Sequence, residues 1–137
     1  MTTRAMLVFL SVLSAPAFGA GIPLLDASGT ARGSAVLRLS KGQIQLKIAG
    51  LAPLPAAATS GSETFTAHLY KAYLFSSADP AVEIFLADVY PNAKQRASRR
   101  IALGGDVSHM AFDRIAVTAF SSDGQKTADV LTASFAP

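Results

Sequence analysis

The sequence predicts an all-β fold: an antiparallel, immunoglobulin-like β-sandwich of about seven strands, preceded by a signal peptide. Three observations lead to this prediction. Apolar and polar residues alternate with a period of two in several segments, turn-forming residues separate these segments, and no stretch has the periodicity of a helix. A chain of 137 residues is expected to form one domain, since domains typically span roughly 100–200 residues.

Composition restricts the class of protein. Half of the residues are hydrophobic and 15% are charged, so the chain can bury enough apolar surface to fold and is not of the disordered class. The absence of cysteine excludes disulfides, thiolate metal sites and thiol catalysis. The formal net charge of +3 is too small to indicate nucleic-acid binding, and no nucleic-acid partner is expected.

The beginning of the chain has the layout of a secretory signal peptide. Arg4 precedes an apolar run of eight residues that is interrupted by one serine, and small residues follow it. Ala17 and Gly19 lie three and one positions before a cut that leaves Ala20 first, and a cut directly after Ala17 is the alternative. The apolar run is shorter than the roughly 20 residues of a membrane span, which argues against an uncleaved anchor.

These features divide the chain into three parts. We expect a signal peptide at residues 1–19, a lead-in segment at 20–33 and the β-sandwich domain at 34–137. The protein is therefore expected to be secreted or periplasmic, with no membrane span after the signal is removed.

The first elements are a short strand and a hairpin. Residues 22–25 (IPLL) predict one strand within the lead-in segment. In residues 35–40 and 43–48, odd-numbered and even-numbered side chains would point to opposite faces of a strand. In the second segment the even-numbered residues are apolar and the odd-numbered ones are polar. This alternation is typical of strands with one buried face. The Ser-Lys-Gly-Gln sequence at 40–43 suits the positive φ of a tight turn.

The middle of the chain predicts a connector and two strands. Residues 50–62 (GLAPLPAAATSGS) predict a connector that crosses between sheets. Residues 64–75 (TFTAHLYKAYLF) are rich in β-branched and aromatic side chains and predict a strand. A turn at 76–80 leads to another strand at 82–89 (VEIFLADV).

The last third predicts two more strands and leaves one segment open. Residues 92–100 (NAKQRASRR) fit either a helical turn or an exposed loop that leads into a strand at 101–103. Residues 112–120 (FDRIAVTAF) alternate as a strand. The Asp-Gly turn at 121–125 joins it to a closing strand at 130–135.

Two segments carry a family resemblance. GLAPLP at 50–55, followed by ETFTAHLY at 63–70, is similar to a Gly-Leu-Pro-Pro-Leu-Pro segment and a Tyr-x-x-Trp strand. FDRIAVTAFSSDG at 112–124 is similar to a Phe-Asp-x-Ile-Ala-Val-Thr strand that runs into a glycine-containing turn. Together they resemble the extracytoplasmic domain of the anti-sigma-K factor family.

The resemblance implies a β-sandwich outside the membrane, and it extends over residues 34–136. It does not imply sigma-factor binding, because the family's membrane helix and cytoplasmic zinc-binding segment have no counterpart in these 137 residues. The tryptophan of the aromatic strand is also absent, and His68 or Leu69 stands at its position.

His68, His109 and Met110 are the imidazole and thioether groups beyond the signal peptide. The alternative function is that of a copper-handling protein in an oxidising compartment, in which these three side chains would bind the metal. A blue-copper site needs a cysteine, and a closed zinc site needs further ligands such as Asp106 or Asp113. The simpler interpretation is two hydrogen-bonded histidines and a core methionine, so no cofactor is expected.

The sequence holds no catalytic constellation. No Gly-x-Ser-x-Gly motif accompanies the histidines, and several aspartates stand beside small or turn-forming residues, where they stabilise turns. We therefore expect a protein that is not an enzyme.

One cluster of cations is a candidate binding surface. Lys94, Arg96, Arg99 and Arg100 lie within seven residues and have no acidic residue among them. They predict contact with a polyanion such as phosphate-bearing lipid or lipopolysaccharide. The alternative is a solvated segment whose charges prevent edge-to-edge pairing of sheets.

Aromatic side chains on the strand predicted at 64–75 form the second candidate surface. Strand alternation places Tyr70 with Leu74 on one face and Tyr73 with Phe75 on the other. Large apolar groups on both faces indicate either a strand covered on both sides or one face open to a partner, which Tyr70 and Tyr73 would contact. We expect a binding or structural accessory module of the cell envelope, whose partner is an envelope protein or a surface polyanion.

Overall fold

The computed structural model describes residues 21–38, 42–78, 82–103 and 112–135. Within these ranges the chain forms ten strands and no helix, and every strand pair is antiparallel. The strands are β1 (Ile22–Leu25), β2 (Ala31–Arg38), β3 (Gln43–Ala49), β4 (Ala56–Ser60), β5 (Glu63–Ala67), β6 (Leu69–Phe75), β7 (Glu83–Val89), β8 (Arg96–Ala102), β9 (Arg114–Phe120) and β10 (Thr127–Ser134). The predicted all-β, antiparallel class is confirmed.

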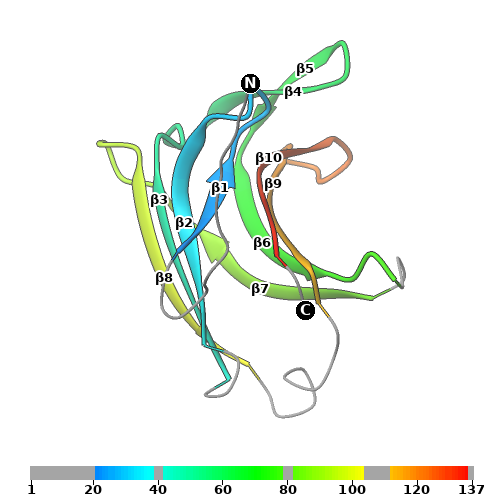
Figure 1. Cartoon of the computed structure of the whole chain (residues 1–137). Helices are drawn as coiled ribbons and strands as arrows, with labels where there is room; N and C mark the ends of the chain where they lie inside the picture. The colour runs from blue at the N-terminus through cyan, green and yellow to red at the C-terminus, as the bar shows by residue number, and fades with distance from the viewer. Residues whose placement is uncertain (1–20, 39–41, 79–81, 104–111, 136–137) are drawn as a thin grey trace, which may run out of the picture.

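Eight strands form one curved sheet in the order β7-β6-β9-β10-β1-β2-β3-β8, and β4 and β5 form a separate hairpin. The sheet consists of two halves of four strands, joined where Leu25 of β1 pairs with Thr132 of β10. The halves face each other, and the two end strands β7 and β8 also make contact, so the sheet is nearly closed and barrel-like (Figure 1). In an immunoglobulin-like sandwich these two halves would be separate sheets, whereas here hydrogen bonds between β1 and β10 join them. The described residues also form ten strands, more than the seven or so that were predicted.

The core lies between the inner faces of the two halves. One half contributes Leu24, Ile44 and Leu46, and the other contributes Leu74 and Ile115, all buried at 0–1% exposure. Apolar burial of this kind is the main favourable term in folding. The alternation read from the sequence is therefore the alternation between core and solvent.

The hairpin predicted around residues 35–48 is confirmed. β2 pairs with β3 so that Ala35 lies opposite Leu46, and both side chains are buried. Gly42 enters β3 with a φ of 62°, a conformation that glycine adopts without steric cost. Residues 40 and 41 of the predicted turn lie outside the described residues.

The lead-in segment belongs to the sheet. The strand predicted at residues 22–25 is β1, and the first residues of β2 also fall within 20–33. Asp26 and Gly29, in the turn between these strands, hold them antiparallel.

The predicted connector at residues 50–62 is partly wrong, because β4 forms within it and pairs with β5. Its Ala-Ala-Ala-Thr-Ser sequence has weak strand propensity, but packing of Ala58, Phe65 and Ala67 on the core stabilises the hairpin. The single strand predicted at 64–75 is also wrong in detail, since the chain leaves one strand and enters the next at His68.

The segment at residues 92–100 is a turn followed by a strand. The Asn92 side-chain oxygen accepts hydrogen bonds from the backbone N–H groups of Lys94 and Arg96, at 2.9 and 3.1 Å. Gln95 adopts a φ of 63°, and β8 begins at the next residue. The asparagine therefore closes the turn with its side chain, a common use of this residue.

The carboxyl-terminal hairpin follows the prediction. β9 and β10 are joined by the Asp-Gly turn, in which the Ser121 hydroxyl donates to Asp123 at 2.6 Å and Gly124 has a φ of 73°. In the part of the chain that the structure describes, no helix is long and apolar enough to cross a membrane.

Candidate binding surfaces

The outer face of β6, β7 and β9 carries a cluster of aromatic rings, which we call the aromatic patch: Tyr73, Phe75, Phe85 and Phe120. The Tyr73 ring centroid lies 5.8 Å from that of Phe85, 6.1 Å from that of Phe75 and 6.4 Å from that of Phe120. These separations are typical of favourable aromatic pairs. Phe85 is 52% exposed, so the patch is open to solvent at β7.

Charged residues of both signs surround the patch. The Lys71 ammonium lies 5.6 Å from the Phe85 centroid and 5.4 Å from that of Phe120, and the Arg114 guanidinium lies 4.8 Å from that of Phe75. Burial raises the pKa of Tyr73, and the negative charges of Glu83 and Asp88 raise it further. An apolar centre with cations and carboxylates around it is the arrangement found in protein–protein interfaces.

The patch also covers the outer face of β9. Ala116 lies opposite Tyr73 and is fully buried, and Thr118 lies opposite Lys71 and is 8% exposed. The Thr118 hydroxyl donates a hydrogen bond of 2.7 Å to Asp129 on β10. Strand β9 is therefore covered on both sides, whereas β6 and β7 present part of their outer face to solvent.

Tyr70 is a core residue and does not lie on this surface, which corrects its assignment as a binding contact. Its side chain is 3% exposed, and its hydroxyl donates a hydrogen bond of 2.8 Å to the Ala52 carbonyl oxygen. Burial raises its pKa. Replacing Tyr70 would open a cavity in the core, so only Tyr73 of the predicted pair can report on surface binding.

The predicted cations divide between two faces of β8. Arg99 lies opposite Leu46 of β3, whose side chain faces the core, whereas Arg100 lies opposite Gln45 on the outer face. Strand alternation places Arg96 on the same outer face as Arg100. Arg99 is exposed on the inner face at this edge of the sheet, where a charge discourages pairing with another sheet.

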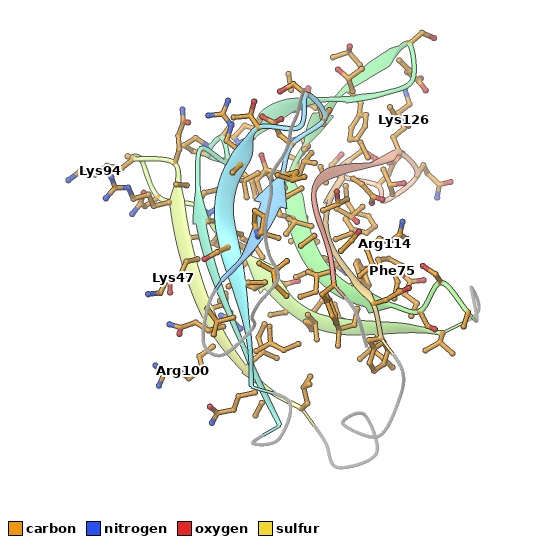
Figure 2. All side chains as sticks on the ribbon, in the orientation of Figure 1. Lys47, Phe75, Lys94, Arg100, Arg114 and Lys126 are labelled. Carbon is orange, nitrogen blue, oxygen red and sulfur yellow. The ribbon has the colours of Figure 1, made fainter. Side chains whose placement is uncertain are left out.

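One further cation, which was not part of the predicted cluster, lies on the outer face of β3 and β8. Lys47 of β3 lies opposite Ser98, between the positions of Arg96 and Arg100, and is exposed. We call Lys47, Lys94, Arg96 and Arg100 the basic strip. Lys47, Lys94 and Arg100 project from the same side of the molecule, away from Phe75 and Arg114 on the other half of the sheet (Figure 2).

The strands of the half that carries the basic strip, β1, β2, β3 and β8, contain no acidic residue. In the described residues, ion pairs form between Arg32 and Asp26 and between Lys126 and Glu63, and neither involves the strip. Within the described part of the chain, the four cations of the strip therefore form no ion pair.

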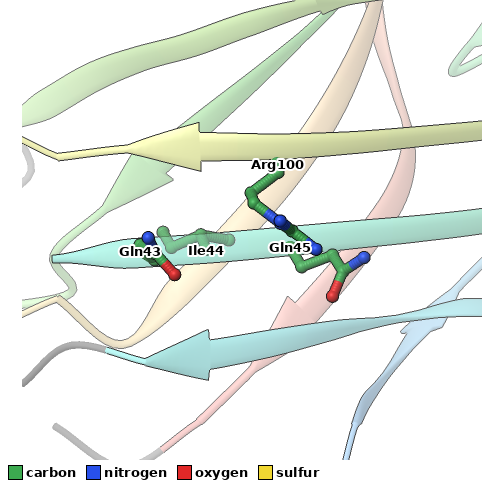
Figure 3. Close-up of a pocket in the computed structure, with 4 residues that line it drawn as sticks. All are labelled: Gln43, Ile44, Gln45 and Arg100. Atoms are coloured by element: carbon green, nitrogen blue, oxygen red, sulfur yellow. The ribbon is translucent and has the colours of Figure 1, made fainter. Parts of the chain in front are cut away.

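A shallow depression borders the strip. Gln43, Ile44, Gln45 and Arg100 line it, and the Arg100 side chain reaches over β3 toward Gln45 (Figure 3). The two glutamine amides and the guanidinium supply N–H donors at one place, which is a chemistry suited to anionic oxygen atoms.

Metal ligation remains a prediction. His68 is exposed between β5 and β6, and both His109 and Met110 lie outside the described residues, as does Asp106. In the described ranges no group of three His, Cys, Asp or Glu side chains is placed to hold a metal ion.

Comparison with protein-family models, with curated proteins and with solved structures finds no match to this chain. The resemblance to the anti-sigma-K family therefore stays a prediction.

Phe85 and Phe120 were not predicted to belong to a binding surface, nor were Lys71 and Arg114, which lie over the rings of the aromatic patch. They come from the consecutive strands β6 and β7 and from the distant strand β9, and their only local signal was the alternation within each strand. The register of β6 with β7 and with β9, which no local pattern specifies, brings them together.

Proposed function

We propose that this protein is a non-enzymatic binding module of the cell envelope that contacts a partner protein through the aromatic patch. The observation that carries the proposal is the cluster of four aromatic rings on one sheet face, in which Phe85 is exposed and Tyr73, Phe75 and Phe120 are partly exposed. Exposed aromatic clusters commonly mark interaction sites, and aromatic side chains and arginine are enriched at interfaces.

The chemistry of the patch favours a protein partner. Lys71 and Arg114 lie over the rings, and Glu83 and Asp88 lie close enough to Tyr73 to influence its pKa. The complementary surface is an apolar centre with charges of both signs around it, which a folded protein provides. A uniformly charged polymer would be repelled by one sign of these charges.

The cellular location and the finer fold assignment are parts of the same proposal. Export to the periplasm or the medium rests on the signal-peptide pattern of residues 1–19. We also propose an immunoglobulin-like sandwich related to the extracytoplasmic domain of anti-sigma-K factors. Its support is that the sheet consists of two facing halves of four strands, joined within the described residues only by the short pairing of β1 with β10.

Site-specific photocrosslinking in the native host tests the partner contact. A photoreactive phenylalanine analogue in place of Phe85 is expected to give one protein adduct of defined mass. The same analogue in place of Thr64, an exposed position on β5, should not give that adduct. Tyr73→Ala in the Phe85-labelled chain should reduce its yield about tenfold or more, since a hot-spot aromatic is worth about 2 kcal/mol or more.

Thermal unfolding of each variant controls for loss of fold. If the folded chain gives no adduct from position 85, or the same adducts from positions 85 and 64, the patch is not a partner surface and the proposed function is wrong.

A further inference from the structure

We propose that the basic strip binds the phosphate groups of an anionic lipid surface. This inference goes beyond the proposed function and does not rest on it, because the strip and the aromatic patch lie on different halves of the sheet. It rests on the position of Lys47, Lys94, Arg96 and Arg100 on one outer face, with no acidic residue on β2, β3 or β8.

The register makes this face a continuous array of donors. Arg96 and Arg100 are four residues apart on β8, a separation of about 13 Å along a strand. Lys47 lies opposite Ser98 between them, on a neighbouring strand about 4.8 Å away. Lys94 extends the array into the turn before β8. Four cations thus face one direction over two strands and a turn.

The depression at Arg100 supplies a place for a single phosphate group. Gln43 and Gln45 stand on the same outer face of β3, and the Arg100 side chain extends toward Gln45 (Figure 3). Guanidinium groups bind phosphate oxygens through two parallel N–H donors, and the amides add neutral donors beside them.

The shape of the strip favours a surface over a linear polymer. Its cations stand side by side on the outside of neighbouring strands, and they do not line the two walls of a groove. Proteins that hold a single-stranded polyanion usually use a groove with stacking aromatic side chains. The exposed aromatic residues Phe85 and Tyr90 come from β7 and the residue after it, not from β2, β3 or β8.

Binding through this strip would orient the molecule. The outer faces of the two halves point in opposite directions, since their inner faces meet in the core (Figures 1 and 2). With the β3–β8 face on the lipid headgroups, the aromatic patch would point away from the bilayer and remain open.

Vesicle sedimentation with the protein purified from the extracytoplasmic fraction tests the proposal. The parent protein should bind phosphatidylcholine vesicles only when phosphatidylglycerol is included, and binding should weaken as salt shortens the Debye length below about 10 Å. Each cation near an anionic membrane contributes about fivefold to affinity, so the double variant Arg96→Gln/Arg100→Gln should bind about 25-fold more weakly.

Arg99→Gln is the matched control for the single variant Arg100→Gln, because each removes one positive charge from β8, the first from the inner face and the second from the outer face. Arg99→Gln should change vesicle binding by less than about twofold and Arg100→Gln by about fivefold, since only charges close to the membrane contribute strongly. Thermal unfolding should be unchanged in all variants, whose altered side chains are exposed.

Three outcomes would overturn the proposal: equal binding to neutral vesicles, equal losses in the Arg99→Gln and Arg100→Gln variants, or no loss in the double variant. Soluble polyphosphate at the same phosphate concentration is the rival ligand. If the parent binds it more tightly than the vesicles, the strip serves a soluble polyanion and the lipid assignment is wrong.

Discussion

Tyr70 and Tyr73 lie three residues apart on β6 and have opposite environments. Strand alternation predicts that they face opposite ways, and that prediction is confirmed. Which of the two faces the core depends on the packing of β6 against the other half of the sheet. Both tyrosines were candidate contacts in the sequence because each belongs to an apolar face.

Asp26 organises the turn between β1 and β2. Its Oδ1 accepts hydrogen bonds from the Ser28 hydroxyl at 2.7 Å and from the backbone N–H groups of Ser28 and Thr30 at 2.9 and 3.0 Å. Its Oδ2 accepts from Arg32 at 3.0 Å. These hydrogen bonds, led by that of Ser28 and then that of Arg32, hold the pKa of the Asp26 carboxyl well below its ordinary value.

We predict that Asp26→Asn lowers the free energy of unfolding at neutral pH. A carboxyl group with a lowered pKa in the folded state contributes stability above its unfolded pKa of about 3.9, and this contribution is lost as the pH falls through the folded pKa. The difference between the parent and Asp26→Asn should therefore shrink below about pH 4. Urea unfolding at several pH values measures it, and a pH-independent difference would contradict this account.

At the scale of elements, β8 illustrates what a linear pattern hides. The sequence at residues 92–100 contains many polar residues, so neither helical nor strand alternation was evident. Pairing with β3 makes it a strand, and the pairing then sorts Arg99 to one face and Arg96 with Arg100 to the other. The cation cluster was predicted, but its division between faces was not.

Gly33 allows the backbones of β2 and β3 to approach closely. A Cβ at this position would collide with the carbonyl oxygen of Lys47 on β3 and crowd the Cα of Ile48, and the residue has a φ of 132°. Glycine is the residue that tolerates both conditions. This close approach occurs in the β2–β3 hairpin, whose strand β3 presents Gln45 and Lys47 on its outer face.

We predict that Gly33→Ala destabilises the protein by roughly 2–4 kcal/mol, because the strands must separate and the backbone is strained. Gly61→Ala is the control, since that glycine also has a positive φ but no heavy atom within 4 Å of an added Cβ. The control should cost about 1–2 kcal/mol. Urea midpoints compare the two variants, and an equal or smaller loss for Gly33→Ala would refute the steric argument.

At the scale of the whole molecule, the curved sheet gives the protein two chemically different outer faces. One half carries the aromatic patch with charges of both signs, and the other carries the basic strip without acidic residues. The small formal net charge of +3 conceals this asymmetry, because it averages over both faces.

We predict that the exported chain begins at Ala20. The small residues Ala17 and Gly19 precede this position as a signal-peptide cut requires. Intact-mass spectrometry of protein from the extracytoplasmic fraction should therefore give the mass of residues 20–137. The mass of residues 18–137 would indicate the alternative cut after Ala17, and a full-length chain would contradict cleavage.

Local patterns in the chain were sufficient for the β class, for the strands β1, β3, β7 and β9 to within about two residues, and for the hairpin turn at residues 121–125. These features depend on alternation and on turn residues, which act over a few neighbouring positions. The β4–β5 hairpin, the single curved sheet and the full composition of both outer surfaces were not available from such patterns. The sheet and the surfaces depend on pairing between strands distant in the sequence, such as β1 with β10 and β3 with β8, and the hairpin depends on packing against the core. The register of such pairing depends on how the whole core packs.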